Sequence, residues 1–175
     1  METFHIRTEN LSKQIPMLHA SDEIFLSGII YTARDAAHKK IRALIETGGT
    51  LPFALKDAVI YYAGPTPARE GMAIGSCGPT TSSRMDIHTP LLMEHGLIGM
   101  IGKGERNKEV IEAIKKHRGI YFCALGGAGA LAAMCIKSCE VIAFPELGCE
   151  SVKKLTIEEF PLLVGIDCNG ETIFK

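Results

Sequence analysis

The segment IFLSGIIYT at residues 24–32 is followed by DAAHKKIRALIE at residues 35–46, and this transition indicates the fold class. The first segment is rich in β-branched and aromatic residues, which predicts a buried strand. In the second segment apolar residues recur at helical spacing, and Gly48-Gly49 follows as a stop signal. A strand that leads directly into a helix is typical of α/β proteins.

The same alternation continues toward the C-terminus. Strands are expected over residues 58–63, 97–101 and 120–125. Helices are expected over residues 84–95 and 107–118, followed by an Ala-rich helix that ends near Lys137. Further short strands are expected at residues 4–7, 141–144, 155–159 and 162–167, with a hairpin turn at Asn169-Gly170. This pattern predicts an α/β fold with a mixed sheet, and residues 1–175 are interpreted as a single domain.

Composition narrows the function classes. A hydrophobic content of 46% and a charged content of 22% are ordinary for a globular protein, and the net charge of -1 gives no bulk support for nucleic-acid binding. No apolar run approaches the roughly 20 residues of a membrane helix, and the N-terminus lacks a signal-peptide pattern. We therefore expect a cytoplasmic protein without membrane contact. Its six cysteines lack paired CxxC spacing and are expected as thiols.

The stretch Gly78-Pro79-Thr80-Thr81-Ser82-Ser83-Arg84-Met85-Asp86 has neither helical nor strand periodicity. Gly and Pro favour a turn, and hydroxyl side chains close behind suit the start of a helix. We expect a rigid loop that presents hydroxyls, backbone N–H groups and one guanidinium to a common point, which would be a candidate anion site. Asp86 is either an acid in the first turn of a helix or the partner of Arg84, and the structural role is favoured.

Three cations stand at element ends rather than within a helix or strand. Arg34 and Lys103 each follow a predicted strand, and Arg84 lies in the loop motif. Together they could bind a small polyanion such as a dicarboxylate or a phosphate, since Arg offers a bidentate fork and Lys a point charge. Spacing alone favours the alternative, in which they are unrelated solvated charges. His38, four residues after Arg34, either supports this site or is an ordinary helix residue.

Two other patterns are interpreted as structural. Residues 127–132, GAGALA, match the dinucleotide fingerprint G-x-G-x-x-A, but too few residues follow them in the 175-residue chain for the rest of such a domain. A tight turn with close helix packing is the preferred interpretation. Cys135 and Cys139 are expected to share a helix face, where two thiols do not complete a metal site. Cys77 lies beside the loop motif, and packing is its expected role.

The loop motif at residues 78–86 resembles the GPTT-x-x-RMD signature of the class I, iron–sulfur fumarate hydratases and L-tartrate dehydratases. The similarity is to their β subunit, or to the C-terminal domain where the two subunits are fused. Four further stretches agree in order, at residues 32–38, 62–65, 102–104 and 145–148. The resemblance covers nearly the whole chain.

This resemblance implies a swivelling β/β/α domain that closes over a [4Fe-4S] cluster held by a separate α subunit. One iron of that cluster binds the substrate as a Lewis acid. Position by position, Arg34, Arg84 and Lys103 match the substrate-binding cations of the family. Thr81 is also assigned to substrate binding. Thr80 matches both a substrate-binding residue and the threonine implicated in proton abstraction. No metal ligand is assigned to this chain.

The function implied is that of the β subunit of a hydro-lyase of the TCA-cycle type, active only with its α subunit. The reaction is hydration of fumarate to L-malate, or dehydration of tartrate, and an α2β2 assembly with β–β contact is implied. The chemistry agrees with the residues, because charge that develops on a substrate carboxylate needs cations placed in advance. Two alternatives remain open at this point: a stand-alone carboxylate- or phosphate-binding module without catalysis, and nucleotide binding at residues 127–132.

Overall fold

The fold is organised on a mixed sheet of seven strands, seen in a computed structural model that describes residues 1–124 and 129–174. The strands span Thr3–Arg7 (β1), Glu23–Thr32 (β2), Val59–Tyr61 (β3), Gly99–Gly102 (β4), Ile120–Cys123 (β5), Ile136–Ala143 (β6) and Val152–Ile166 (β7). Their order is β1-β2-β3-β4-β5-β7-β6. Strands β1 to β5 run parallel to one another, whereas β7 is antiparallel to its neighbours.

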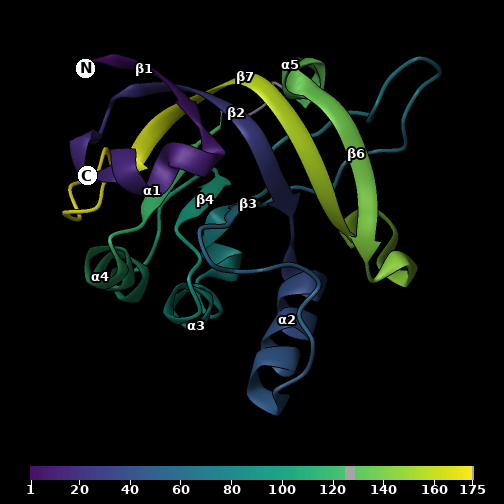
Figure 1. Ribbon diagram of the computed structural model, residues 1–175, viewed down its shortest axis with the longest axis horizontal. Helices are drawn as coiled ribbons and strands as arrows, with labels where there is room; N and C mark the ends of the chain where they lie inside the picture. Colours follow the sequence, from purple (N-terminus) through teal and green to yellow (C-terminus); the bar gives the residue numbers. More distant parts are fainter. Residues whose placement is uncertain (125–128, 175) are drawn as a thin grey trace.

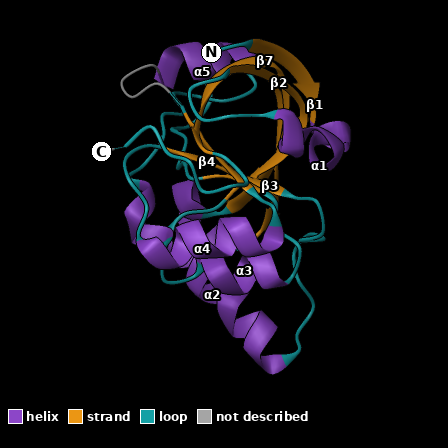
Figure 2. Cartoon of the chain, turned by 90° about the vertical axis from the view of Figure 1, so that its left-hand side faces the viewer, coloured by secondary structure: helices purple, strands orange, loops and turns teal. Residues whose placement is uncertain are grey.

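Strand β7 closes the sheet into a small barrel (Figure 2). Besides β5 and β6, it pairs along most of β2, from Glu23 opposite Leu163 to Thr32 opposite Lys153. The register shifts near Gly28, whose φ of +120° suits glycine, and a Cβ there would lie 2.2 Å from Thr8 Oγ1. The bend at this position lets β2 and β7 curve around the barrel.

Three helices cover one side of the barrel (Figures 1 and 2). They are α2 (Asp35–Thr47), α3 (Thr89–Glu94) and α4 (Lys108–His117). The remaining helical segments are α1 (Leu11–Gln14), α5 (Gly129–Cys135), and the 3-10 turns η1 (Thr8–Asn10), η2 (Ile15–Met17), η3 (Ser82–Met85) and η4 (Pro145–Glu150). Within the described ranges, none of the helices has the length and apolar character needed to cross a bilayer.

Two hydrophobic cores lie on the two faces of the central strands. Val59 and Tyr61 of β3 point into the barrel, whereas Ile60 and Tyr62 pack against the helices. Strand β5 alternates in the same way, with Phe122 on the barrel side and Tyr121 on the helix side. Because both faces are buried, these strands form nearly continuous apolar runs in the sequence.

The predicted α/β class with a mixed sheet is confirmed. Strands β1 and β2 and helices α2 and α4 lie within one residue of their expected bounds. Helix α2 ends at Gly48 in the left-handed conformation, and the side chain of Asn107 caps α4 by accepting from Val110 N. The turn at Asn169-Gly170 is also present, with Gly170 at φ +86°.

The predicted helix over residues 84–95 is wrong. The 3-10 turn η3 ends at Met85, and α3 begins only at Thr89. Pro90 stands in the first turn of α3, where its missing N–H costs nothing. In one continuous helix the proline ring would clash with the preceding turn and a hydrogen bond would be lost. The chain therefore stops and restarts between Asp86 and Thr89.

Three expectations near the C-terminus are also wrong: the start of the strand at residue 141, the helix face shared by Cys135 and Cys139, and the break between the two closing strands. The Ala-rich helix ends at Cys135, and the strand β6 begins at once with Ile136, well before the predicted strand at residues 141–144. Cys139 is thus on a strand, and it does not share a helix face with Cys135. The two closing strands are a single strand β7, which bends at Glu159 (φ +49°) instead of ending before Pro161. The pairing of β7 with β2 and β6 outweighs the local sequence signals for a helix near Lys137 and for a break before Pro161.

Candidate functional site

The carboxyl ends of β2, β3 and β4 bring the predicted residues to one edge of the sheet. Arg34 follows β2 as the N-cap of α2, and Lys103 follows β4. The loop motif crosses between them: Thr80 N donates to Tyr62 O at 2.7 Å, and Ser82 N donates to Lys103 O at 2.9 Å. Thr81 forms a parallel bridge with Lys103. We call Arg34, Thr80, Thr81, Arg84 and Lys103 the strand-end cluster.

Arg34 and Arg84 meet at one carboxylate, that of Asp35. Arg84 Nε donates to Asp35 Oδ1 at 3.0 Å, and Arg84 Nη2 lies 2.9 Å from Asp35 Oδ2. Arg34 Nη2 lies 3.8 Å from the same Oδ2, and Arg34 Nε lies 3.7 Å from Glu150 Oε1. The two cations that are 50 residues apart in sequence thus share a partner, and Asp35 and Glu150 were not identified from the sequence.

The strand-end cluster forms two groups on an open surface. Arg34 and Arg84 are joined through Asp35, while Thr81 and Lys103 are joined through the backbone. In residues 1–124 and 129–174, the Lys103 ammonium pairs with no carboxylate, so no shared acid joins it to the two arginines. Thr81, Arg84 and Lys103 are exposed, and Arg34 and Thr80 are half-buried. A ligand bridging both groups would complete the arrangement.

A buried arginine anchors the loop motif from below. Arg106, whose side chain is 0% exposed, donates from Nε to Asp86 Oδ1 at 2.6 Å and from Nη2 to Thr89 Oγ1 at 2.8 Å. Its guanidinium also lies over the rings of Tyr62 and Tyr121. Asp86 Oδ2 accepts from Asn107 N at 2.8 Å. Asp86 is therefore structural, but it is the C-cap of η3 rather than an acid in the first turn of a helix, and its partner is Arg106 and not Arg84. A lone Arg between a strand and a helix offered no signal of this pairing.

A second buried contact fixes the start of the turn η3. Ser82 Oγ and the Tyr121 hydroxyl lie 2.9 Å apart, and the Tyr121 hydroxyl donates to Gly104 O at 2.8 Å. A Cβ at Gly102 would lie 1.9 Å from Ser82 Oγ, so the loop motif and β4 approach as closely as glycine permits. Tyr121 thus connects the loop motif to the Gly102-Lys103-Gly104 turn.

His38 lies under the backbone of Arg34. Its Nδ1 donates to Arg34 O at 2.9 Å, because a carbonyl oxygen only accepts, and this assigns the proton to Nδ1. Burial lowers the pKa of His38 to about 4, so the ring is neutral near pH 7. The ring of His88 stacks on it at a centroid distance of 5.8 Å, and burial also lowers the pKa of His88. His38 therefore supports the junction that carries Arg34.

The described cysteines do not fit the ligand set of an iron–sulfur cluster. Such a site needs several thiolates close together, and in the described part of the chain no three His, Cys, Asp or Glu side chains gather. Burial raises the pKa of the Cys77 thiol to about 12 and also raises the pKa values of the thiols of Cys123, Cys135 and Cys139. These environments favour neutral thiols rather than ligands.

Close packing explains the part of the GAGALA segment that is described. A Cβ at Gly129 would lie 2.3 Å from Ser76 Oγ, and Cys77 N donates to Gly129 O at 3.1 Å. The glycine therefore lets α5 approach the loop motif, as expected of a residue used for close packing. Gly127 and Ala128 lie outside the described residues.

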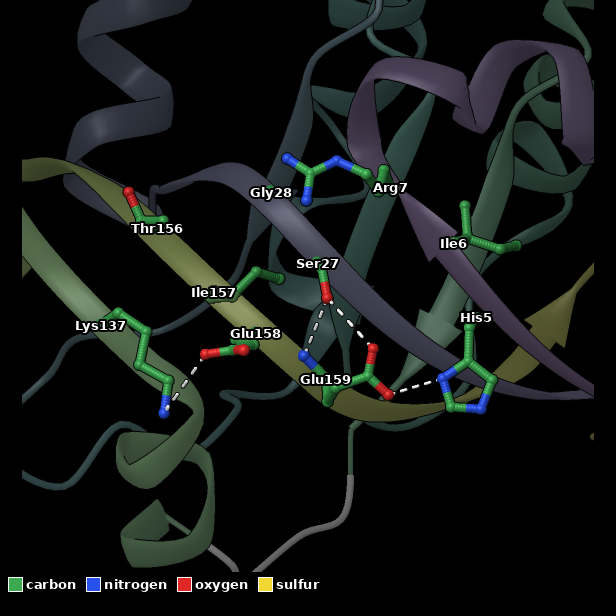
Figure 3. Close-up of a pocket in the computed structure, with 10 residues that line it drawn as sticks. All are labelled: His5, Ile6, Arg7, Ser27, Gly28, Lys137, Thr156, Ile157, Glu158 and Glu159. Carbon is green, nitrogen blue, oxygen red and sulfur yellow. Dashed lines mark hydrogen bonds and ion pairs between the residues drawn. The ribbon is translucent and has the colours of Figure 1, made fainter.

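A cavity of about 420 Å³ lies on the outer face of the barrel, between β1, β2, β6 and β7 (Figure 3). Its charged side chains pair with one another: His5 Nδ1 lies 2.6 Å from Glu159 Oε2, and Lys137 Nζ lies 3.8 Å from Glu158 Oε2. Arg7 also lines it and pairs with Glu9. We call this the outer-face cavity, and no residue of the strand-end cluster lines it.

Comparison with known proteins places these observations in a family context. The family model described as the fumarase C-terminus matches residues 1–175. The chain is 42% identical over 164 residues to the anaerobic class I fumarate hydratase of Escherichia coli (strain K12), covering 93% of this chain and 30% of that protein. It is 39% identical over 169 residues to fumarate hydratase 2 of Leishmania major, covering 95% of this chain and 30% of that protein.

A shorter relative matches over most of its length. The chain is 36% identical over 169 residues to the putative L(+)-tartrate dehydratase subunit beta of Methanocaldococcus jannaschii, covering 93% of this chain and 87% of that protein. The chain thus spans about 30% of the fumarate hydratases above and nearly all of a subunit. Both kinds of relative are hydro-lyases by name.

Proposed function

The chain belongs to the fumarase C-terminus family, and from this premise we propose that it supplies the dicarboxylate-binding half of a hydro-lyase active site. The observation that carries the proposal is the meeting of Arg34 and Arg84 at Asp35, with Lys103 and Thr81 at the end of β4, which β3 separates from β2. Two guanidiniums and an ammonium at one sheet edge suit a ligand with two carboxylates. The substrate is fumarate with L-malate, or tartrate.

The reaction explains why cations are needed in this position. Removing water from a 2-hydroxy diacid breaks a C–H bond next to a carboxylate, and negative charge builds up on that carboxylate. In the proposal Arg34, Arg84 and Lys103 bind the substrate carboxylates and stabilise this charge. The anchoring of the loop motif by Arg106 and Tyr121 keeps Arg84 and Thr80 in place before substrate arrives.

Thr80 is proposed as the catalytic residue and as a substrate contact beside Thr81. Its backbone is held by the bond from Thr80 N to Tyr62 O, and its side chain is half-buried at the cluster. A threonine hydroxyl is a weak base, so proton abstraction through Thr80 needs an adjacent base that accepts its proton. We propose that this base lies on the partner subunit.

The partner in the proposal is an α subunit that carries a [4Fe-4S] cluster, since the described thiols of this chain do not fit one. The cluster would supply Lewis-acid chemistry at the substrate hydroxyl when bound. The chain would act as one swivelling domain that closes over it, in an α2β2 complex of the cytoplasm. Closure by a second subunit would also explain why the strand-end cluster lies on an open surface.

The test is reconstitution with a cluster-bearing subunit, followed by assays of fumarate hydration and tartrate dehydration. Arg84→Ala is expected to reduce kcat/KM roughly 100-fold, because a charge-assisted carboxylate contact is lost. The matched control is Arg7→Ala, which removes an exposed arginine at the outer-face cavity and should leave activity unchanged. Wild-type turnover in Arg84→Ala would contradict the proposed role of the strand-end cluster.

The same preparation tests the stand-alone binding module. Titration of the chain alone with fumarate, malate and phosphate should show weak binding, because in the proposal the α subunit supplies the other side of the substrate site. Micromolar binding without a partner would favour the module over the hydro-lyase half-site.

A further inference from the structure

We propose that Asp35 is a positioning residue, which holds Arg84 by one edge of its guanidinium so that the other edge faces the substrate carboxylate. The inference rests on the proposed function and adds to it a residue that touches neither substrate nor reacting atoms. It begins from the contacts of Arg84, which uses Nε and Nη2 for the same carboxylate.

The shape of the guanidinium explains why Asp35 orients Arg84 instead of blocking it. Arginine has five N–H donors arranged around a planar fork. Asp35 lies along the side formed by Nε and Nη2, at 3.0 Å and 2.9 Å. The end of the fork, formed by Nη1 and the outer hydrogen of Nη2, makes no hydrogen bond or ion pair with the described residues. Because the Arg84 side chain is 50% exposed, that end is open to a carboxylate.

Asp35 is itself fixed in place, as an orienting group must be. It is the first residue of α2, where the partial positive charge of the helix N-terminus stabilises a carboxylate. It stands directly after the N-cap Arg34, whose carbonyl is held by His38 N and His38 Nδ1. Its side chain is 27% exposed, so its position is determined by packing more than by solvent.

Asp35 also sets the distance between the two arginines. Arg34 Nη2 lies 3.8 Å from the Oδ2 atom that faces Arg84, so one oxygen stands between two guanidiniums. Glu150 flanks Arg34 on its other side, at 3.7 Å from Nε. Arg34 Nε, Asp35 Oδ2 and Glu150 Oε1 are buried, and none of them makes a hydrogen bond in the described chain. The contacts around Arg34 are therefore looser than those of Arg84, and Asp35 keeps the two cations close to each other.

The experiment compares Asp35→Asn with Asp35→Glu and with Glu146→Gln in the reconstituted complex. Glu146→Gln removes one negative charge from an exposed pair with Lys40, which involves neither arginine, and serves as the matched control. We expect Asp35→Asn to raise KM for the dicarboxylate about tenfold while kcat changes less, because substrate binding weakens when Arg84 is no longer oriented. Asp35→Glu keeps the charge and should restore part of the loss.

A second readout needs neither the partner nor turnover. In ¹⁵N NMR spectra, the Arg84 Nε–H signal should be sharp and slow to exchange in the wild type and in Glu146→Gln. It should broaden in Asp35→Asn and partly recover in Asp35→Glu. A purely structural role for Asp35 would lower thermal stability without this selective change at Arg84.

The outcomes separate the two proposals. A lower KM in Asp35→Asn would show that Asp35 competes with the substrate, and a KM equal to that of Glu146→Gln would show no role; either result overturns this inference. A wild-type complex with no hydro-lyase activity would instead overturn the proposed function. In that case an unchanged Arg84 signal in Asp35→Asn would independently contradict the contact on which the inference stands.

Discussion

The strand-end cluster and the outer-face cavity are both rich in charged side chains, but they differ in what lies beneath them. The outer-face cavity is the more concave of the two, and its ion pairs join exposed residues such as His5, Glu159 and Lys137. The strand-end cluster lies on an open surface, yet the loop that carries Thr80, Thr81 and Arg84 rests on the buried pair of Arg106 and Asp86. Concavity and anchoring are thus found in different places.

This difference suggests where binding energy is available. Exposed ion pairs contribute little, since water and salt screen them and long side chains lose entropy when they are held. Side chains on an anchored loop lose less entropy on binding, so more of each contact appears as affinity. We therefore propose the strand-end cluster, and not the outer-face cavity, as the functional site.

The strongest test of the comparison removes the anchor. Arg106→Met is expected to cost about 3–5 kcal/mol of unfolding free energy, because it leaves the Asp86 carboxylate buried without its cation. Urea unfolding of the isolated chain would measure this loss. Asp86→Asn combined with Arg106→Met removes both charges and keeps an acceptor for Asn107 N, so it should recover much of the loss. Equal losses in the single and double variants would contradict a buried charge pair.

The next test uses the pH dependence of stability at His38. The pKa of buried His38 is about 4, below its ordinary value of 6.5, so the unfolded chain binds a proton that the folded chain resists. Stability should therefore fall as the pH drops from 6.5 toward 4, by at most about 3 kcal/mol from this residue. In His38→Gln the decline should be shallower, with a remainder from His88, whose pKa burial also lowers. Unfolding titrations at several pH values would show it, and a wild-type slope in His38→Gln would refute it.

The smallest expected effect is at the outer-face cavity. Lys137→Ala breaks an exposed pair with Glu158 at 3.8 Å and should change the unfolding free energy by less than about 0.5 kcal/mol. Activity of the reconstituted complex should be unchanged. A clear loss of turnover in Lys137→Ala would mean that the cavity takes part in function, and the comparison drawn here would fail.

The strand-end positions were largely predictable from the sequence, because local signals determine them. Arg34 and Lys103 were expected at the ends of strands. Strand β4 ends directly before Lys103, and one residue separates the end of β2 from Arg34. The Gly and Pro residues of the loop motif predicted a turn, and η3 begins within it. The conformation of residues 84–95 was predicted incorrectly, since the hydrophobic spacing there hid the interruption before Pro90.

The contacts among these residues were not predictable in the same way. Asp35 and Arg84 are far apart in the chain, as are Asp86 and Arg106, and nothing in either local pattern specifies the partner. The first part of strand β6 was likewise missed, because residues 136–140 form a strand by pairing with β7 rather than by their own propensity.

The sequence by itself determined the α/β class, the bounds of most central elements and the residues that stand at the strand ends. Those features depend on hydrophobic periodicity and on Gly and Pro, which act over a few neighbouring residues. Only the tertiary structure decided the closure of the barrel by β2 and β7, the buried anchor at Arg106 and the sharing of Asp35 by two arginines. These features depend on contacts between distant segments, which form only when the hydrophobic cores bring the segments together.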